Sequence, residues 1–184
     1  MFRRTGMTIN RKKCVFNAAE TKFFGFIFSA EGIAPDPDKV QALKEASAPT
    51  SKEEVRSFLG LAGFNSQFIP GYATKSEPLR ALTRKGESFG LIKDTISETT
   101  LLSYYDTKKE TALFTDASPV GVNAILAQKD ENGLWKPVNI ASRALNETEM
   151  GYDQLEREAL AMHFGCMRFK IFLQGIHFTH FINP

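Results

Sequence analysis

The chain has 184 residues, of which 42% are hydrophobic, and its 23 basic and 21 acidic side chains give a net charge of +2. This composition is typical of a folded globular protein and excludes a wholly disordered chain. No apolar run approaches the roughly 20 residues that span a bilayer, so we expect no membrane partner. No secretion signal follows the basic start of the chain, which predicts an intracellular protein, cytoplasmic or nuclear, with Cys14 and Cys166 reduced.

The positive charge is concentrated at the beginning of the chain. Residues 1–13 contain five basic side chains and no acidic one, so the remaining residues carry a net charge of −3. A basic arm beside a nearly neutral body is compatible with contacts to phosphate groups. An ordinary exposed chain end has the same composition, so this pattern alone does not decide between the two. The arm consists of Arg3, Arg4, Arg11, Lys12 and Lys13.

The first part of the chain has the pattern of short strands. The runs 14–16 and 22–29 are rich in aromatic and β-branched residues, and the second predicts a strand that is buried on both faces. Gly25 in its middle indicates a bulge or a close backbone approach. Residues 30–32 form a turn signal, after which Ile33 would begin a returning strand. Taken alone, the phenylalanines of this region are simply core residues.

Three helices are expected next. Asp36 with the following proline is an N-cap signal for the first helix, and the second follows a capping box that starts at Thr50 or, one residue later, at Ser51. Apolar spacing continues that second helix to Phe68. A third, shorter helix is expected over about residues 73–82. Together these signals predict a compact helical subdomain.

The second half of the chain predicts a sheet with a helix. A boundary between two domains falls most naturally at residues 84–100, which are polar and irregular. Beyond it, alternation and turn residues predict a β-hairpin, a third strand, a long helix and a last strand. These elements are expected at residues 111–116, 121–128, 135–141, 148–173 and 177–182.

Two acidic residues in this half are candidate functional residues. Asp116 ends a strand that is expected to be central, where rigid backbone holds a carboxylate at the solvent, as a metal site requires. The alternative is that Asp116 only caps the following turn through backbone amides. In the long helix, an apolar stripe at 4-3-4-3-4 spacing predicts the buried face, and Glu158 would lie at its margin, pointing inward beside the sheet. This stripe consists of Leu155, Ala159, Met162, Cys166, Phe169 and Leu173.

Five segments, in their order along the chain, resemble gypsy-type retrotransposon Pol polyproteins. Residues 23–40 are similar to the end of the reverse transcriptase palm, and residues 57–70 are similar to the thumb. Three further motifs resemble the ribonuclease H domain of the same polyproteins. The match covers nearly the whole chain. The motifs are Phe23-Phe-Gly-Phe with Ala30-Glu-Gly-Ile-Ala-Pro, Ser57-Phe-Leu-Gly-Leu with Phe68-Ile-Pro, Thr115-Asp-Ala-Ser, Ala141-Ser-Arg-Ala-Leu, and Tyr152 with Glu156-Arg-Glu-Ala-Leu-Ala.

The resemblance implies an α+β fold in four parts. Residues 1–34 would be the end of the palm, with a β-hairpin that resembles the primer grip, and residues 35–83 a small helical thumb. Residues 84–100 would be a shortened linker. Residues 101–184 would be a ribonuclease H-like mixed β-sheet with a long helix, incomplete at its C-terminus.

The resemblance also implies an activity, namely metal-dependent hydrolysis of RNA in RNA–DNA hybrids during reverse transcription. Such sites hold Mg²⁺, or Mn²⁺, with several carboxylates. Carried over by motif, Asp116 and Glu158 would be the catalytic and metal-binding residues. The implied partners are an RNA–DNA hybrid or other nucleic acid and the remainder of a Pol polyprotein. The residues expected to contact nucleic acid are Arg11, Lys12, Lys13, Phe23, Phe24, Gly25 and Arg143.

The sequence also departs from the family pattern. The paired aspartates of the polymerase site are absent, so we expect no DNA synthesis by this chain alone. The position expected to carry a third carboxylate is Asn183, which is neutral and does not offset the charge of a cation. We therefore expect ribonuclease activity to be lost or strongly impaired. The alternatives are a non-catalytic module derived from a retroelement that binds nucleic acid or protein, and a remnant with no selected role.

Overall fold

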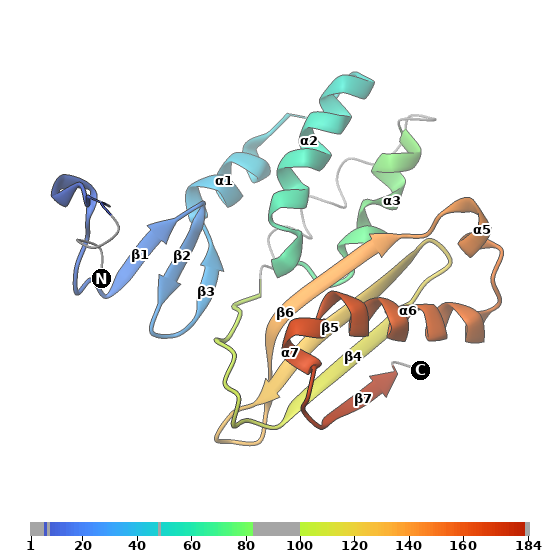
Figure 1. The fold of residues 1–184 in the computed structure, drawn as a ribbon. Helices are drawn as coiled ribbons and strands as arrows, with labels where there is room; N and C mark the ends of the chain where they lie inside the picture. The colour runs from blue at the N-terminus through green and yellow to red at the C-terminus, as the bar shows by residue number, and fades with distance from the viewer. Residues whose placement is uncertain (1–5, 7, 48, 83–99, 183–184) are drawn as a thin grey trace.

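The computed structural model describes residue 6 and residues 8–47, 49–82 and 100–182. A small three-stranded sheet, a group of helices and a larger four-stranded sheet follow one another along the chain (Figure 1). The fold is α+β, as the sequence predicts. Asn183 and the predicted linker at residues 84–100, apart from residue 100, lie outside the described residues.

The first sheet is antiparallel, and the run predicted as one strand at residues 22–29 forms a hairpin in it. β1 and β2 pair up to Phe23 and Phe26, so the turn between them has two residues, Phe24 and Gly25. Both have positive φ angles, 49° and 79°, as the tightest hairpin turns require. The one-strand prediction was wrong because Gly25 allows the chain to reverse here. The strands are β1 (Glu20–Phe23), β2 (Phe26–Ser29) and β3 (Ile33–Pro35).

The helices begin at the N-caps that the sequence predicts. Asp36 caps α1, and Ser51, rather than Thr50, caps α2, each by accepting a hydrogen bond from a first-turn backbone N–H. α2 ends at Phe64 and not at Phe68, because the chain tightens there into a short 3-10 turn that contains Phe68. The elements are α1 (Pro37–Glu45), α2 (Lys52–Phe64), η3 (Ser66–Phe68) and α3 (Tyr72–Leu82).

The larger sheet has the strand order β6-β5-β4-β7. β4 is a central strand, antiparallel to β5 on one side and parallel to β7 on the other. Pro137 lies in the edge strand β6, beside a register irregularity at Leu126 and Ala127, where a missing backbone N–H is tolerated. The predicted order of three strands, helix and strand is confirmed. The strands are β4 (Thr111–Ala117), β5 (Gly121–Lys129), β6 (Trp135–Ala144) and β7 (Phe178–Ile182).

The helix predicted over residues 148–173 is divided into three. After Gly151, Asp153 and Glu156 form a capping box that begins a new helix. The segments are α5 (Glu147–Met150), α6 (Gln154–Arg168) and α7 (Lys170–Leu173). Across the described ranges, none of the helices combines the length and the apolar character that crossing a membrane requires.

α6 packs on the sheet with a different side from the predicted one. Leu155 is 75% exposed and Met162 is 42% exposed, so this part of the predicted stripe faces the solvent, as does Ala159. The buried positions are Ala161 and Gly165. At the end of the stripe the prediction was correct, since Phe169 and Leu173 are buried.

Small residues explain why α6 turns this side to the sheet. A Cβ atom built on Gly165 would lie 3.1 Å from the Cβ of Ala124 and 3.1 Å from a methyl group of Leu113. Glycine therefore lets the helix backbone approach β4 and β5 more closely than a larger residue would. A hydrophobicity pattern does not reveal this preference, because glycine and alanine contribute little to it.

The opposite face of the sheet is covered by η3 and the start of α3 (Figure 1). Phe68 is completely buried and packs with Leu102 and Ile140. The backbone N–H of Ala73 donates to the hydroxyl of Ser142 at 3.0 Å. The larger sheet thus has helices on both faces, and the helical subdomain packs directly against it.

Replacing Gly165 with alanine tests this close approach. We expect the free energy of unfolding to fall by about 1–3 kcal/mol, because the added methyl group overpacks the contact with β4 and β5. Urea unfolding followed by circular dichroism measures the change. Gly60→Ala is the matched control: Gly60 lies in helix α2, and a Cβ atom there meets nothing within 4 Å. That variant should gain up to about 1 kcal/mol from helix propensity. Equal effects of the two substitutions would contradict the packing argument.

Candidate functional site

Asp116 lies near the end of β4 on the face of the sheet that α3 covers. Its partner in register is Asn123 of β5, whose amide Nδ2 donates to Asp116 Oδ2 at 3.4 Å. Asn123 is in turn the register partner of Ser142, which accepts the bond from α3. Because register partners project from the same face of a sheet, Asp116 points toward α3 and away from α6.

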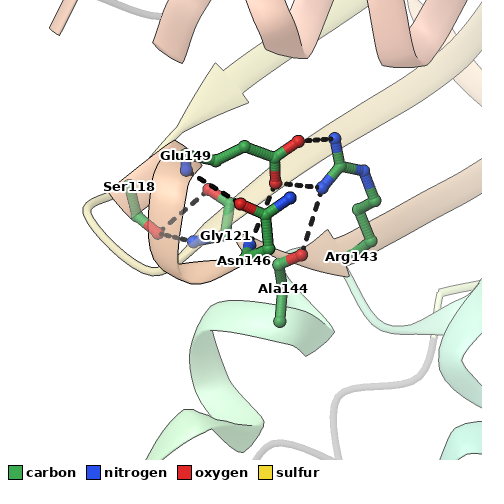
Figure 2. A network of polar contacts seen from close by, with 6 residues as sticks. All are labelled: Ser118, Gly121, Arg143, Ala144, Asn146 and Glu149. Carbon is green, nitrogen blue, oxygen red and sulfur yellow. Dashed lines mark hydrogen bonds and ion pairs between the residues drawn. The ribbon is translucent and has the colours of Figure 1, made fainter. Parts of the chain in front are cut away.

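The turn that follows β4 is held by Ser118 and not by Asp116. The Ser118 hydroxyl accepts from the backbone N–H of Gly121 at 3.0 Å and donates to its carbonyl at 3.1 Å. This pair is visible in Figure 2. The turn is therefore capped by Ser118, and the alternative interpretation of Asp116 as the cap of this turn is not supported.

A cavity of about 600 Å³ lies over Asp116, between the sheet and the start of α3. One wall comes from the helical side, through Pro70, Gly71 and Lys75. The sheet supplies the other wall, and Asn123 lies in it with only 8% of its surface exposed. The remaining lining residues are Phe114, Thr115, Ile125, Phe181 and Ile182.

An aromatic cluster forms part of the sheet wall. The rings of Phe114 and Phe181 stack with centroids 4.7 Å apart and an interplanar angle of 15°. Trp135 meets both rings edge-on, at 5.8 and 6.0 Å. The cavity therefore combines an aromatic surface with a carboxylate, an amide and a lysine.

Glu158 lies on α6, which covers the other face of the sheet. It is half-buried and lies one turn before the buried Ala161. Its carboxylate Oε1 accepts a hydrogen bond from Gln154 Nε2 at 2.9 Å. Asp116 thus lies on the face of the sheet that α3 covers, whereas Glu158 belongs to the helix on the other face.

The described residues do not fit a two-metal carboxylate site. Within the described ranges, no three side chains of His, Cys, Asp or Glu lie close enough together to hold a metal ion. The neighbour of Asp116 is the neutral amide of Asn123, which turns its Nδ2 toward the carboxylate, and the third expected position, Asn183, is outside the described residues. A single carboxylate with one amide offers little of the negative charge on which Mg²⁺ sites depend.

Arg143 is held by an acidic partner in the structure. Its guanidinium donates to both carboxylate oxygens of Glu149, at 2.7 and 2.8 Å, and also to the carbonyl of Ala144 (Figure 2). Glu149 is fixed in place because it forms the capping box of α5 with Asn146. The hydrogen bonds from Arg143 hold the pKa of Glu149 below its ordinary value. The planar fork of Arg143 is therefore occupied and is not free for a phosphate group.

The predicted nucleic-acid contacts near the N-terminus are exposed. Arg11, Lys12 and Lys13 form the 3-10 helix η2, whose residues all face the solvent. The residues that follow, 14–16, were predicted as a strand but are irregular. Within the described part of the chain, none of the three basic residues takes part in an ion pair. Their charges are therefore available to a ligand.

The β1–β2 turn also presents aromatic residues to the solvent. Phe23 and Phe24 are 57% and 77% exposed, with ring centroids 4.4 Å apart. They are therefore not core residues. Gly25 has a φ of 79°, which favours glycine, and the side chain of Lys39 passes over it to reach the ring of Phe64.

Two residues of the cavity were not identified from the sequence. Asn123 could have been found by counting outward from a four-residue turn at residues 118–121, which places it opposite Asp116 and makes it an unexpected polar residue in an apolar strand. Lys75 gives no such signal, because its place beside the sheet depends on how α3 packs.

The fold is similar to that of solved structures of a viral protein. The foamy viral protease-reverse transcriptase dRH in complex with double-stranded DNA has a TM-score of 0.73 at 21% identity, covering 90% of this chain and 31% of that one. The same viral protein in complex with an RNA/DNA hybrid has a TM-score of 0.74 at 20% identity, covering 94% of this chain and 25% of that one. The fold of this chain is thus the one found in a part of these viral structures.

Sequence comparison identifies the family. The family described as an RNase H-like domain found in reverse transcriptase matches residues 83–180, more than half of the chain, and the chain belongs to it. The retrovirus-related Pol polyprotein from transposon 297 of Drosophila melanogaster is 35% identical over 177 residues, covering 90% of this chain and 16% of the polyprotein. The Pol polyprotein from transposon gypsy of the same organism is 32% identical over 192 residues, covering 92% of this chain and 18% of that polyprotein. The chain therefore spans less than a fifth of these relatives.

Replacing Glu149 with glutamine tests the ion pair with Arg143. The pKa of Glu149 is lower in the folded chain than its ordinary value of 4.5. The pair therefore adds stability above about pH 4.5, and this contribution is lost as the pH falls through the folded-state pKa. We expect Glu149→Gln to lower the free energy of unfolding by about 1–3 kcal/mol at pH 7 and by less near pH 3. Denaturant titrations at both pH values measure the difference.

Glu147→Gln is the matched control, since it removes the same charge from an exposed position in the same short helix. Its effect should stay within about 0.5 kcal/mol at both pH values. A loss for Glu149→Gln that does not change with pH would show that the charge of Glu149 contributes nothing.

Proposed function

We propose that this chain is the part of a retrotransposon Pol polyprotein in which the reverse transcriptase thumb meets a ribonuclease H-like domain, and that its hydrolysis of RNA–DNA hybrids is lost or strongly impaired. Membership of the family supports the proposal that an ancestor of this chain hydrolysed RNA–DNA hybrids. The observation that carries the proposed loss is the placement of Asp116 in the cavity beside α3, while Glu158 lies on the opposite face of the sheet.

A metal-dependent nuclease needs several carboxylates around its ions. When such ions are bound, they activate a water molecule and stabilise charge on the scissile phosphate. In this chain, Asp116 contributes a carboxylate and Asn123 a neutral amide, and Glu158 is hydrogen-bonded to Gln154. Removing groups that position a metal costs orders of magnitude in rate. The residues present therefore support weak catalysis at most.

A second candidate function is non-catalytic binding of nucleic acid. The observation that favours it is the exposure of Arg11, Lys12 and Lys13, which form no ion pair with another described residue, together with the exposed rings of Phe23 and Phe24. Basic side chains bind phosphates without regard to sequence, and exposed aromatic rings stack on bases. The solved foamy viral proteins are complexes with double-stranded DNA and with RNA/DNA hybrid, and we propose an RNA–DNA hybrid as the ligand of this chain as well.

Cleavage of a labelled RNA–DNA hybrid tests the proposed loss of activity. We expect the natural chain to cleave no faster than Asp116→Asn in Mg²⁺ or in Mn²⁺, because Asp116 and Glu158 lie on elements at opposite faces of the sheet and Asn183 adds no negative charge. Product formation is followed on a denaturing gel over several hours. Cleavage by the natural chain that disappears in Asp116→Asn would refute the proposal.

The dependence of hybrid affinity on salt tests the binding function. Removing two phosphate contacts with Lys12→Gln/Lys13→Gln should reduce the slope of log affinity against log salt concentration by about 1.5. Fluorescence anisotropy at several salt concentrations gives this slope. Lys108→Gln/Lys109→Gln is the matched control, because it removes the same charge from an exposed pair elsewhere on the chain. A loss of slope that is equal in both variants would show that the N-terminal lysines form no specific contact.

A further inference from the structure

Strand β7 forms an open edge of the larger sheet. It pairs with β4 on one side, and none of the described strands pairs with it on the other side. An edge strand presents a row of unpaired backbone N–H and C=O groups, which can pair with a strand of another chain. The exposed side chains of β7 include two large apolar ones, since Phe181 is 39% and Ile182 is 50% exposed.

The other edge strands carry features that discourage such pairing. β1 contains the charged side chains of Glu20 and Lys22. β3 ends at Pro35 and is bridged by Leu102. β6 contains Pro137 beside a register irregularity. Charges, prolines, covering segments and irregular register are the usual protection of a sheet edge. β7 contains no lysine, arginine, acidic residue or proline, so its edge is unprotected.

The flank of α6 on the β7 side is also apolar and exposed. Phe164 marks the flank toward the other edge of the sheet, because the guanidinium Cζ of Arg143 in β6 lies 5.7 Å from its ring centroid. A helix turns by about 100° per residue, so Leu155, Ala159 and Met162 lie on the opposite flank. Leu155 is 75% exposed and Met162 is 42% exposed. The open edge and the apolar flank therefore lie on the same side of the domain.

A second copy of the chain matches this side through a two-fold axis at His180. Such an axis sets the two β7 strands antiparallel and brings their free edges together. The pairs across the axis are then Phe178 with Ile182 and Thr179 with Phe181. Apolar, aromatic and β-branched pairs of this kind stabilise a sheet. His180 lies on the axis, and its Nε2 atom already has a hydrogen bond within its own copy.

The charges of α6 also favour an antiparallel second copy. Residues 153–158, at the start of the helix, contain three acidic side chains and one basic side chain. Residues 167–170, at its end, contain two basic side chains and no acidic one. The two-fold axis reverses the direction of α6 as well as that of β7. The acidic start of one helix therefore lies toward the basic end of the other, and such complementarity favours the correct partner and register.

We infer that this chain forms a two-fold dimer in which β7 continues the sheet into a second copy and the apolar flanks of α6 turn toward each other. Pairing of two five-residue strands is a small contact. Specific interfaces bury about 800 Å² on each partner, so the flank of α6 must supply further apolar surface. The inference goes beyond the proposed function, since it requires neither nucleic acid nor a metal ion.

Sedimentation of the full chain over a range of concentrations, without nucleic acid, tests the inference. We expect a reversible equilibrium between the monomer of 20.6 kDa and a dimer of twice that mass. A two-fold contact closes on itself, so no larger species should form. A monomer at every concentration, or species that continue to grow beyond the dimer, would overturn the inference.

Thr179→Lys tests the pairing of the strands. We expect the dissociation constant of the dimer to rise by about tenfold or more, because a charge then lies at the edge, opposite Phe181 of the second copy. Thr179 is exposed, so the thermal midpoint of the monomer should not change. Thr21→Lys is the matched control, since it makes the same change at an exposed position of the edge strand β1. It should dimerise like the natural chain. An unchanged dissociation constant in Thr179→Lys would overturn the assignment to β7.

Leu155→Gln tests the flank of α6. The dissociation constant should rise by about threefold or more, because the variant removes apolar surface from the contact. Leu134→Gln is the matched control, since Leu134 is 58% exposed and precedes β6, at the other edge of the sheet. Equal dissociation constants of the two variants would overturn the part assigned to α6. Because these measurements contain neither metal nor nucleic acid, their failure would leave the hydrolysis and salt experiments unaffected.

Discussion

The close contact between α6 and the central strands determines the arrangement of the second half of the chain. Gly165 lets the helix backbone approach Ala124 and Leu113, so that face of the sheet is sealed by helix backbone and small side chains. The other face is sealed by Phe68 and the start of α3. Strands β4 and β5 are consequently buried on both sides, and most residues of β5 are inaccessible to solvent. Each polar side chain on these strands must therefore find a partner inside the protein or line a cavity.

Some polar residues of the sheet find a partner inside the protein, and others line a cavity. Gln128 is fully hydrogen-bonded at one end of β5, and it fixes the loop that carries Asp106. Asp116 and Asn123, toward the other end of the ladder, face a cavity, and their bonding capacity is only partly used. Arg143 lies on the opposite face from this pair and is neutralised by Glu149. Among the described polar residues of these two strands, the only buried atom without a partner is therefore Asn123 Oδ1, beside Asp116.

The sequence predicts the features that depend on local chemistry. The caps at Asp36 and Ser51 and the strands on both sides of the turn at residues 118–120 follow from side chains near in sequence. The inward side of α6 could not be predicted, since Leu155 and Met162 form an equally apolar stripe and the choice depends on the small size of Gly165. For the candidate site, Asp116 was identified from its motif, but the face toward which it points depends on register and on the docking of α3. The ion pair of the Arg143 guanidinium could not be predicted either, because it depends on the separate short helix that carries Glu149.

The parallel pairing of β4 and β7 has a consequence for how the chain folds. β5 and β6 join β4 through short hairpins, whereas Thr111 of β4 pairs with Phe178 of β7 across most of the domain's sequence. Contacts between distant residues form slowly, because the intervening chain must lose its freedom before they contribute any stability. During synthesis, one edge of β4 stays open until α6 and α7 have been made. A nascent chain therefore exposes an unpaired strand edge for most of this interval, and such an edge favours aggregation.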